Sequence, residues 1–567
     1  MYCVYIGAQE KDSLLEVRTN HGWVLGKKLT NSVYAWNGIP YAKPPLGDLR
    51  FEAPVAPNNW TGIWDATYDR SECVSFIVSE LAENINNPRG DEDCLYVNVY
   101  TPKPPQSIHT PLAVMVWIHG GSFLHGNGSY ALYSPTELVR EGVIVVSFNY
   151  RLGIFGFLST NDNAVPGNTG LRDQLFALNW VQNNIRTFGG NPNQVTIFGE
   201  SAGAASVSYL VLSPLSRGLF SRAIMESGTA LCIWSLSKKA SEAAFAVGAI
   251  MESGTALCIW SLSKKASEAA FAVGATLGIN TTSSTDLVRA LKNVSAKDLH
   301  RAAILIMGTI LARSPIDGLV YAPVMEPPGD NAVVTISSYE RLHYGAFNRV
   351  TQIMGYNSAE FYLFQNLVGL ILKYLANYNL TSAHLVPSSM RARKSNLPTI
   401  GDQIKAYYGD NDETVLFPKS RLLNYLSDTA FVRPIQKTVQ LTSKYAMTYF
   451  YKFSYNSIAG ALGAGHADEL KYIFDNENDI SVDEKNVAKC MKKLWTNFAK
   501  YGNPSYRLGS RICNGIFWKP MTPSDRRKLY YINIDKVVTR GSNPDGENMT
   551  FWNNLFEKYA LGPLQLY

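Results

Sequence analysis

Continuous apolar runs of strand length occur in the first half of the chain. Residues 111–119 (PLAVMVWIH) and 143–150 (VIVVSFNY) consist mostly of apolar and β-branched side chains, with no alternating polar position. This pattern is typical of strands that are covered on both faces, as in a parallel sheet. Residues 170–188 follow with leucine, valine and isoleucine at helical spacing. The spacing predicts a helix that packs one apolar face against the sheet.

A further predicted strand ends at a serine between glycines. Residues 194–200 (QVTIFGE) predict this strand, and residues 202–212, which begin with small side chains, predict a helix directly after Ser201. Alternating strands and helices indicate βαβ units and a mostly parallel sheet. No Gly/Ser-rich or Pro-rich tract divides the chain. We therefore expect a single α/β domain over residues 1–567, with a mostly parallel central sheet flanked by helices.

One segment occurs twice in tandem. Residues 223–248, which begin AIMESG, recur letter for letter as residues 249–274. Repeat architectures are built from three or more units, so two identical copies do not indicate a solenoid. Such a duplication is typical of a recent exon duplication or of an error in the gene sequence. Only one AIMESG can occupy a given strand position, so we expect one copy to be extra.

The serine between glycines carries a specific chemical signal. Gly199-Glu200-Ser201-Ala202-Gly203 matches G-x-S-x-G, a strand-to-helix turn that exposes a nucleophilic serine. Glycines two positions before and after the serine permit the close backbone approach that the turn requires. The helix after Ser201 also directs its first N–H groups towards the place where an oxyanion would form. The motif therefore predicts a nucleophile at Ser201.

A glycine pair follows an earlier predicted strand. His119-Gly120-Gly121 comes at the end of the run at residues 111–119, and the N–H groups of such a pair can donate to an oxyanion. A Gly-Gly pair alone is most often a turn. Its position at a strand end, ahead of the serine motif, makes Gly120 and Gly121 candidate oxyanion donors.

Chain order narrows the choice of a catalytic histidine. Where the nucleophile occupies such a turn, the triad order is serine, acid, histidine, which leaves His300, His343, His384 and His466 after Ser201. His384 lies in a polar segment (NLTSAHLVPSS), and His466 lies in a glycine-rich segment (GAGHADEL) after a strand-like run. The glycine-rich loop suits an imidazole delivered from a loop. The residues alone leave both of these histidines as candidates.

Composition and charge exclude some classes of function. The net charge is +6, from 52 Lys and Arg against 46 Asp and Glu, without a long basic run, so we expect no nucleic-acid partner. The apolar runs at residues 303–312 and 367–376 are shorter than the roughly 20 residues of a transmembrane helix. The first residues lack a signal-peptide pattern. We expect a cytoplasmic protein, or a secreted one if the recorded start is incomplete. Nothing in the sequence predicts an oligomeric state.

The ordered motifs resemble those of type-B carboxylesterases, the family that includes cholinesterases and insect esterases. The resemblance extends from Gly22 to about Trp552. The matching stretches are NGIPYAKPPLGDLRF (37–51), EDCLYVNVYTP (92–102), WIHGGSF (117–123), NYRLGIFGFLS (149–159), FGGNPNQVTIFGESAG (188–203), GLFSRAIMESG (218–228), GYNSAEFYLF (355–364), GAGHADELKYIF (463–474) and LWTNFAKYGNP (494–504). The residues around NSAEF and HADEL are most similar to insect α-esterases. The resemblance implies an α/β-hydrolase fold.

The resemblance implies a catalytic triad. Ser201 is the expected nucleophile, Glu360 in NSAEF the expected acid and His466 in GHADEL the expected base. His466 would accept the Ser201 proton during attack on an ester carbonyl, while Glu360 orients the imidazole. Activity would fall as the pH drops through the histidine pKa, about 6.5 when unperturbed. The implied reaction is hydrolysis of a small-molecule ester through an acyl-enzyme, with no metal and no organic cofactor.

The resemblance also implies roles outside the triad. The N–H groups of Gly120, Gly121 and Ala202 are the expected oxyanion donors, each worth about 3 kcal/mol in the transition state. Cys73 and Cys94 bracket a polar loop and are the expected disulfide partners. The chain has seven cysteines, so they cannot all pair within it.

Two alternatives to a general carboxylesterase stay open. Some similar proteins lack the nucleophile and act in adhesion, whereas here all triad positions and oxyanion glycines are filled. The other alternative is an esterase specialised for juvenile hormone or a pheromone ester, although juvenile hormone esterases have Gln where this chain has Glu200. Cholinesterases carry a tryptophan in the first disulfide loop, which stacks on a quaternary ammonium. Residues 74–93 contain none, which argues against choline esters.

Overall fold

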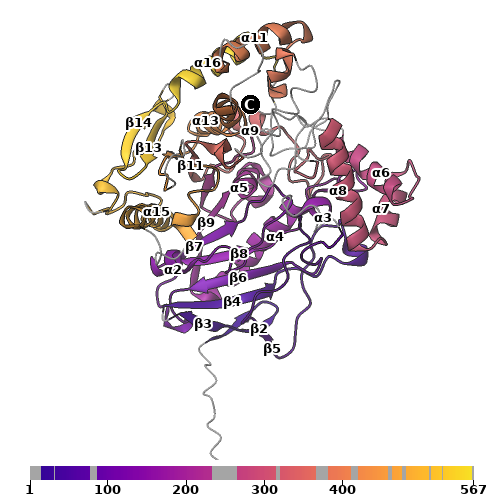
Figure 1. Cartoon of the computed structure of the whole chain (residues 1–567). Coiled ribbons are helices and arrows are strands. Elements are labelled where there is room, and N and C mark those ends of the chain that lie inside the picture. Colours follow the sequence, from indigo (N-terminus) through magenta and orange to yellow (C-terminus); the bar gives the residue numbers. More distant parts are fainter. Residues whose placement is uncertain are drawn as a thin grey trace, which may run out of the picture.

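The alternating elements form a large mixed sheet in the computed structural model. The structure describes residues 15–30, 32–76, 86–232, 265–313, 320–364, 381–409, 419–457, 463–474, 481–509, 512–525, 528–562 and 564. Across these residues the sheet has 11 strands in the order β14-β13-β12-β11-β10-β9-β7-β8-β6-β4-β3. Figure 1 shows it twisting from β3 and β4 at the bottom of the view to β13 and β14 at the upper left. A second sheet of three strands has the order β1-β2-β5.

The described elements have the following bounds. The strands are β1 (Glu16–Thr19), β2 (Gly22–Leu25), β3 (Lys27–Thr30), β4 (Val33–Pro40), β5 (Ile63–Asp65), β6 (Tyr96–Thr101), β7 (Leu112–Ile118), β8 (Ile144–Phe148), β9 (Gly190–Glu200), β10 (Arg222–Glu226), β11 (Thr351–Asn357), β12 (Thr448–Phe453), β13 (Tyr530–Ile534) and β14 (Thr539–Ser542). The helices are α2 (Thr136–Arg140), α3 (Gly153–Phe157), α4 (Thr169–Asn184), α5 (Ala202–Leu212), α6 (Lys265–Thr276), α7 (Ser284–Lys292), α8 (Ala296–Arg313), α9 (Ser338–His343), α11 (Leu397–Tyr408), α12 (Lys419–Ser427), α13 (Arg433–Thr442), α14 (Lys471–Phe474), α15 (Val482–Tyr501) and α16 (Gly546–Tyr559).

The centre of the large sheet is parallel, and its edges are antiparallel. Neighbouring strands from β8 through β7, β9, β10, β11 and β12 to β13 all pair in parallel. The β3-β4-β6-β8 edge and the β13-β14 edge pair antiparallel. The strands predicted from apolar runs correspond to β7, β8 and β9, and the predicted helices to α4 and α5. The predicted α/β fold class with a mostly parallel central sheet is confirmed.

Strand β7 illustrates why the sheet needs apolar residues at every position. Val114, Val116 and Ile118 belong to the core that also contains the buried residues of α4 and α5. Met115 and Trp117 belong to the opposite core, which contains the buried residues of α2 and α15. Because successive side chains of a strand point to opposite faces, both sets must be apolar. The carboxyl ends of these central strands carry the residues of the candidate site.

The described fold contains the beginning of the first copy of the duplicated segment and the end of the second copy. Strand β10, which includes the first AIMESG up to Glu226, belongs to the first copy. Helix α6 starts at Lys265, in the second copy. Residues 233–264, which include the second AIMESG, lie outside the described residues. Within the described residues, the first ten residues of the repeat come from the first copy and the last ten come from the second.

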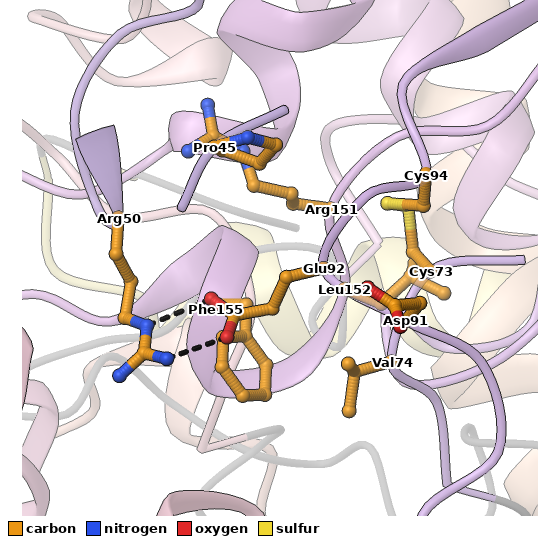
Figure 2. Close-up of a pocket in the computed structure, with 10 residues that line it drawn as sticks. All are labelled: Pro45, Arg50, Cys73, Val74, Asp91, Glu92, Cys94, Arg151, Leu152 and Phe155. Carbon is orange, nitrogen blue, oxygen red and sulfur yellow. Dashed lines mark hydrogen bonds and ion pairs between the residues drawn. A yellow bond between two sulfur atoms is a disulfide. The ribbon is translucent and has the colours of Figure 1, made fainter. Parts of the chain in front are cut away.

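A disulfide and an ion pair stabilise the region ahead of β6. Cys73 and Cys94 are joined by a disulfide. Beside it, Arg50 donates from Nε and Nη2 to the two carboxylate oxygens of Glu92, at 2.7 and 2.5 Å (Figure 2). The remaining nitrogen of Arg50 donates to the carbonyl of Val294 at 2.6 Å. The pair therefore ties the disulfide loop to the segment that follows α7.

Cys490 in α15 and Cys513 form a second disulfide, which the sequence analysis did not predict. The apolar run at residues 303–312 lies within α8, and the run at 367–376 lies outside the described residues. Among the helices that the structure describes, none has the length and apolar character of a membrane span.

Candidate active site

Ser201 occupies the sharp turn between β9 and α5. Its φ of 55° and ψ of −120° lie outside the regions that residues with side chains favour. The Ser201 N–H donates to the carbonyl of Glu226 at 2.9 Å, and the Ser201 carbonyl accepts from the N–H of Ala205 at 2.9 Å. Such a conformation persists only where its surroundings fix it. The strand, turn and helix that the serine motif predicts are therefore all present.

The two glycines of the motif allow the backbone of β7 to approach the turn. A Cβ atom on Gly203 would lie 2.0 Å from the carbonyl oxygen of Ile118, and one on Gly199 would lie 2.6 Å from the same oxygen. Neither distance leaves room for a side chain. The end of β7 therefore packs directly against the serine turn, and this contact brings the following glycine pair to Ser201.

Gly120 and Gly121 lie beside the serine. A Cβ atom on Gly120 would lie 3.2 Å from the Cβ of Ser201, and Gly121 has a φ of 103° that favours glycine. The segment is fixed from behind, because the Tyr150 hydroxyl donates to the carbonyl of His119 at 2.8 Å. The rings of these two residues stack with centroids 4.4 Å apart. The glycine turn is thus held next to the Ser201 side chain.

Ala202 is the first residue of α5. The N–H groups of the first helical turn have no partner within the helix, and the positive end of the helix dipole lies there. The Ala202 N–H is therefore available beside Ser201 in the same way as the N–H groups of the Gly120 turn. All three residues predicted as oxyanion donors lie around the serine.

His466 bridges Ser201 and Glu360. Its Nε2 lies 2.9 Å from the Ser201 Oγ, and its Nδ1 lies 2.7 Å from a Glu360 carboxylate oxygen. The histidine is delivered by the loop before α14, and Glu360 begins the short helix η8 (Glu360–Phe364) after β11. The ring of Phe431 packs against the imidazole at a centroid distance of 4.8 Å. This arrangement can transfer a proton from the serine hydroxyl to the imidazole.

Two backbone N–H groups hold Glu360, one through its carboxylate and one through its main-chain carbonyl. Its second carboxylate oxygen accepts from the Asn357 N–H at 2.8 Å. The His466 N–H donates to the Glu360 carbonyl at 3.1 Å. Glu360 is fully buried, so these contacts fix its carboxylate against the imidazole without competition from water.

Glu200 also contacts His466, although the sequence analysis gave it no role in the site. One of its carboxylate oxygens lies 3.0 Å from the His466 Nε2, the same nitrogen that faces Ser201. Both side chains are buried. Nε2 therefore has the Ser201 hydroxyl as its hydrogen-bond partner, and the Glu200 carboxylate lies close enough to stabilise a protonated imidazole by charge.

Two further buried carboxyls, Glu226 and Glu469, lie near Glu200 and His466. Glu469 accepts from the Asn357 side-chain amide and from the Ser227 hydroxyl, the latter at 3.3 Å. Glu226 accepts from the indole N–H of Trp495 at 3.0 Å. Burial, reinforced by the charges of neighbouring carboxylates, raises the pKa of Glu469, and burial raises that of Glu226 to about 8.

The surrounding charges also shift the pKa values of His466 and Glu200. Burial lowers the pKa of His466, but the negative charges of Glu200 and Glu360 outweigh it, so the net pKa is raised above 6.5. Burial raises the pKa of Glu200 to about 7, although His466 opposes the shift. The imidazolium form is therefore stabilised, as a general base that must carry a proton in a transition state requires.

The structure brings together most of the residues that the sequence singled out. Ser201, Glu360 and His466 form one hydrogen-bonded chain, whereas the side chain of the alternative His384 lies outside the described residues. Glu469 could have been noticed as the last acidic residue of HADEL, and Glu226 as the end of a strand beside the serine motif. Within the described residues, no group of three His, Cys, Asp or Glu side chains has the arrangement of a metal site.

Comparison with known proteins identifies similar sequences over nearly the whole chain. The model of the carboxylesterase family matches residues 13–249 and 240–552, two segments that meet in the duplication. Carboxylesterase 1C of Rattus norvegicus is 33% identical, over 96% of this chain and 93% of that protein. Para-nitrobenzyl esterase of Bacillus subtilis is 32% identical, over 94% and 97%. A carboxylic ester hydrolase of the bumblebee Bombus ignitus is 31% identical, over 92% and 90%.

Solved structures give the same result for the fold. The juvenile hormone esterase of Manduca sexta, with OTFP covalently attached, superposes with a TM-score of 0.79 at 27% identity, over 96% of this chain and 99% of that one. A PNB esterase superposes with a TM-score of 0.72 at 30% identity, over 95% and 99%. The large sheet and its helices are thus shared with esterases from an insect and with the PNB esterase.

Proposed function

This chain belongs to the carboxylesterase family, and on that premise we propose that it is a serine carboxylesterase that uses Ser201, His466 and Glu360. The single observation that supports this proposal best is the continuous chain of contacts from the Ser201 hydroxyl through both nitrogens of His466 to Glu360. Family membership supports the ester as the class of substrate, and the geometry supports these residues as the ones that act on it.

The proposed mechanism begins with attack by Ser201 on the ester carbonyl. His466 Nε2 accepts the hydroxyl proton, and Glu360 stabilises the imidazolium that results. The Gly120, Gly121 and Ala202 N–H groups donate to the oxyanion, with about 3 kcal/mol from each donor. His466 returns the proton to the leaving alcohol, and an acyl group stays on Ser201. Water, deprotonated by the same histidine, then releases the acid and restores the serine.

The proposed substrates are carboxylic esters without a quaternary ammonium group. The polar loop between Cys73 and Cys94 contains no tryptophan that would stack on such a cation. A general carboxylesterase agrees with the Bombus ignitus relative, a carboxylic ester hydrolase, whereas the Manduca sexta structure is that of a juvenile hormone esterase, the specialised alternative. Specialisation for one ester has no support from a particular residue of the described site.

Hydrolysis of a short aryl ester by the full chain tests the proposal. We expect the wild type to turn over nitrophenyl acetate and Ser201→Ala to lose about 10⁶-fold in kcat, the scale for a triad serine. Ser206→Ala is a matched control on the same helix, because the Ser206 hydroxyl accepts from Gln174 rather than from His466. We expect this control to keep the wild-type activity. If Ser201→Ala hydrolysed the ester as fast as the wild type, the proposed nucleophile would be wrong.

A further inference from the structure

Four residues form a row across the carboxyl ends of four neighbouring strands. Glu200 of β9 pairs in register with Glu226 of β10, Glu226 pairs with Gly355 of β11, and Gly355 pairs with Tyr451 of β12. Side chains in register on adjacent strands point to the same face of a sheet. Glu200 and Glu226 therefore lie on one face, side by side and without an intervening strand.

The glycine in this row opens the space next to Glu226. A Cβ atom on Gly355 would lie 2.2 Å from the ring of Tyr451, so the tyrosine ring occupies the place of a side chain on β11. Tyr451 also packs against Trp495, with ring centroids 5.3 Å apart. Glu226 is thus enclosed by Glu200 on one side and by two aromatic rings on the other, and it is completely buried.

The surroundings of Glu226 favour its neutral form. Its Oε1 accepts from the uncharged indole N–H of Trp495, and its Oε2 has no hydrogen-bond partner within the described residues. The ionisable groups that face it are Glu200 from β9, Tyr451 from β12 and Glu469 from the loop that carries His466. No described Lys or Arg forms an ion pair with it. An isolated buried carboxylate is costly, so Glu226 retains a proton.

Glu200 has the opposite surroundings. Its carboxylate lies 3.0 Å from His466 Nε2, so it has a partner that favours the charged form. Two adjacent buried carboxyls do not ionise together without a large penalty, and the proton remains on the carboxyl with the poorer partner.

We propose that Glu226 is a positioning residue that holds a proton beside Glu200 and thereby favours the ionised form of Glu200 against His466. The inference rests on the proposed esterase function and deepens it. Glu226 touches neither substrate nor the reacting atoms and acts through Glu200. The causes of the pKa shifts agree with this assignment, because burial raises the pKa of both carboxyls and the charge of His466 opposes the rise only for Glu200.

Ionisation of Glu226 beside Glu200 should lower kcat/KM at alkaline pH. When Glu226 loses its proton, a second negative charge appears behind Glu200 and raises the proton affinity of the group formed by Glu200 and His466. The Ser201 N–H donates to the main-chain carbonyl of Glu226, so this second charge also lies next to Ser201 and opposes the oxyanion of the transition state. We therefore expect kcat/KM of the wild type to fall with a midpoint near the Glu226 pKa of about 8.

Glu226→Gln is the decisive variant, because the amide has the shape of the protonated acid and still accepts from Trp495. We expect it to keep more than about a tenth of the wild-type kcat/KM at pH 7 and to lose the alkaline fall. Trp495→Phe removes the hydrogen bond that lowers the Glu226 pKa, so the alkaline midpoint should move to higher pH. Asp428→Asn is a matched control, since Asp428 is another buried carboxyl with a raised pKa but lies outside the row. The alkaline fall should persist in this control.

Infrared difference spectroscopy supplies a readout that does not depend on hydrolysis. The wild type should lose protonated-carboxyl C=O intensity in a step near pH 8, and Glu226→Gln should lack this step while the bands of Glu200, Asp428 and Glu469 remain. An alkaline fall or an intensity step unchanged in Glu226→Gln would overturn the carboxyl pair. If the wild type hydrolysed no ester but the step behaved as expected, the proposed function would fail and the pair would stand.

Discussion

Buried charge is arranged in two contrasting ways in this protein. Near the disulfide of Cys73 and Cys94, Arg50 is paired with Glu92, and Arg151 is paired with Asp173 through Nε and Nη2 at 2.8 and 2.6 Å. Each carboxylate has a guanidinium that matches both of its oxygens, as Figure 2 shows for Arg50 and Glu92. Such pairs are neutral as a unit and geometrically specific.

The candidate active site has carboxyls in excess. Glu200 and Glu360 contact the imidazole of His466, Glu226 and Glu469 lie near Glu200, and no described Arg or Lys pairs with any of them. The pKa values of Glu200 and Glu226 are raised by burial to about 7 and about 8. Matched pairs therefore fix structure over a wide range of pH, whereas the unmatched group titrates near neutrality, where proton transfer is useful.

Breaking a matched pair should have the largest effect on stability. Arg151→Met leaves Asp173 completely buried without its guanidinium, so we expect the free energy of unfolding to fall by about 3 to 5 kcal/mol. Urea denaturation measures the loss. Replacing both partners, as Arg151→Met with Asp173→Leu, removes the uncompensated charge and should recover much of the stability. If the single variant were as stable as the wild type, the pair would have no structural role.

Removing Glu200, one carboxylate of the unmatched group, should shift the pKa of His466 and should cost less stability than breaking a matched pair. Glu200→Gln removes the strongest of the influences that raise the His466 pKa, so this pKa falls. The neutral imidazole then persists to lower pH, and the acid limb of kcat/KM should move to lower pH. Glu226→Gln is the matched control, because Glu226 is already neutral in this range, and its acid limb should stay in place. An unmoved acid limb in Glu200→Gln would contradict the role of Glu200.

Deleting residues 249–274 should have the smallest effect. The remaining chain still supplies the AIMESG of β10, including Glu226, and one copy of the α6 sequence. A shorter connection between the same elements costs less closure entropy, about 0.6 kcal/mol for each halving of its length. We expect kcat/KM within about twofold of the full chain and a melting temperature that is equal or slightly higher. A deletion variant that does not fold would show that both copies are needed.

Local sequence patterns were sufficient to predict the elements that carry the nucleophile. The apolar runs before His119 and Asn149, and the glycines around Ser201, act through neighbouring residues, so β7, β8, β9 and α5 follow from the sequence. His466 and Glu360 needed the family resemblance, because the residues alone left His384 as an alternative.

The carboxyl group beyond the triad could not be predicted in the same way. The row from Glu200 to Tyr451 depends on the register of four strands that are far apart in the sequence. No periodicity within one strand contains that register. The disulfide between Cys490 and Cys513 was missed for a similar reason, because it depends on where η14 (Cys513–Gly515) packs against α15.

Covalent labelling with a fluorophosphonate tests the central claim most directly, since the probe reacts with a serine only when a neighbouring base activates it. Intact-mass and peptide analysis of the full chain should find one adduct, on the peptide that contains Ser201. Labelling should weaken as the pH falls through the raised pKa of His466, and His466→Ala should remain unlabelled. An adduct on another residue, or labelling that persists in His466→Ala, would contradict the account.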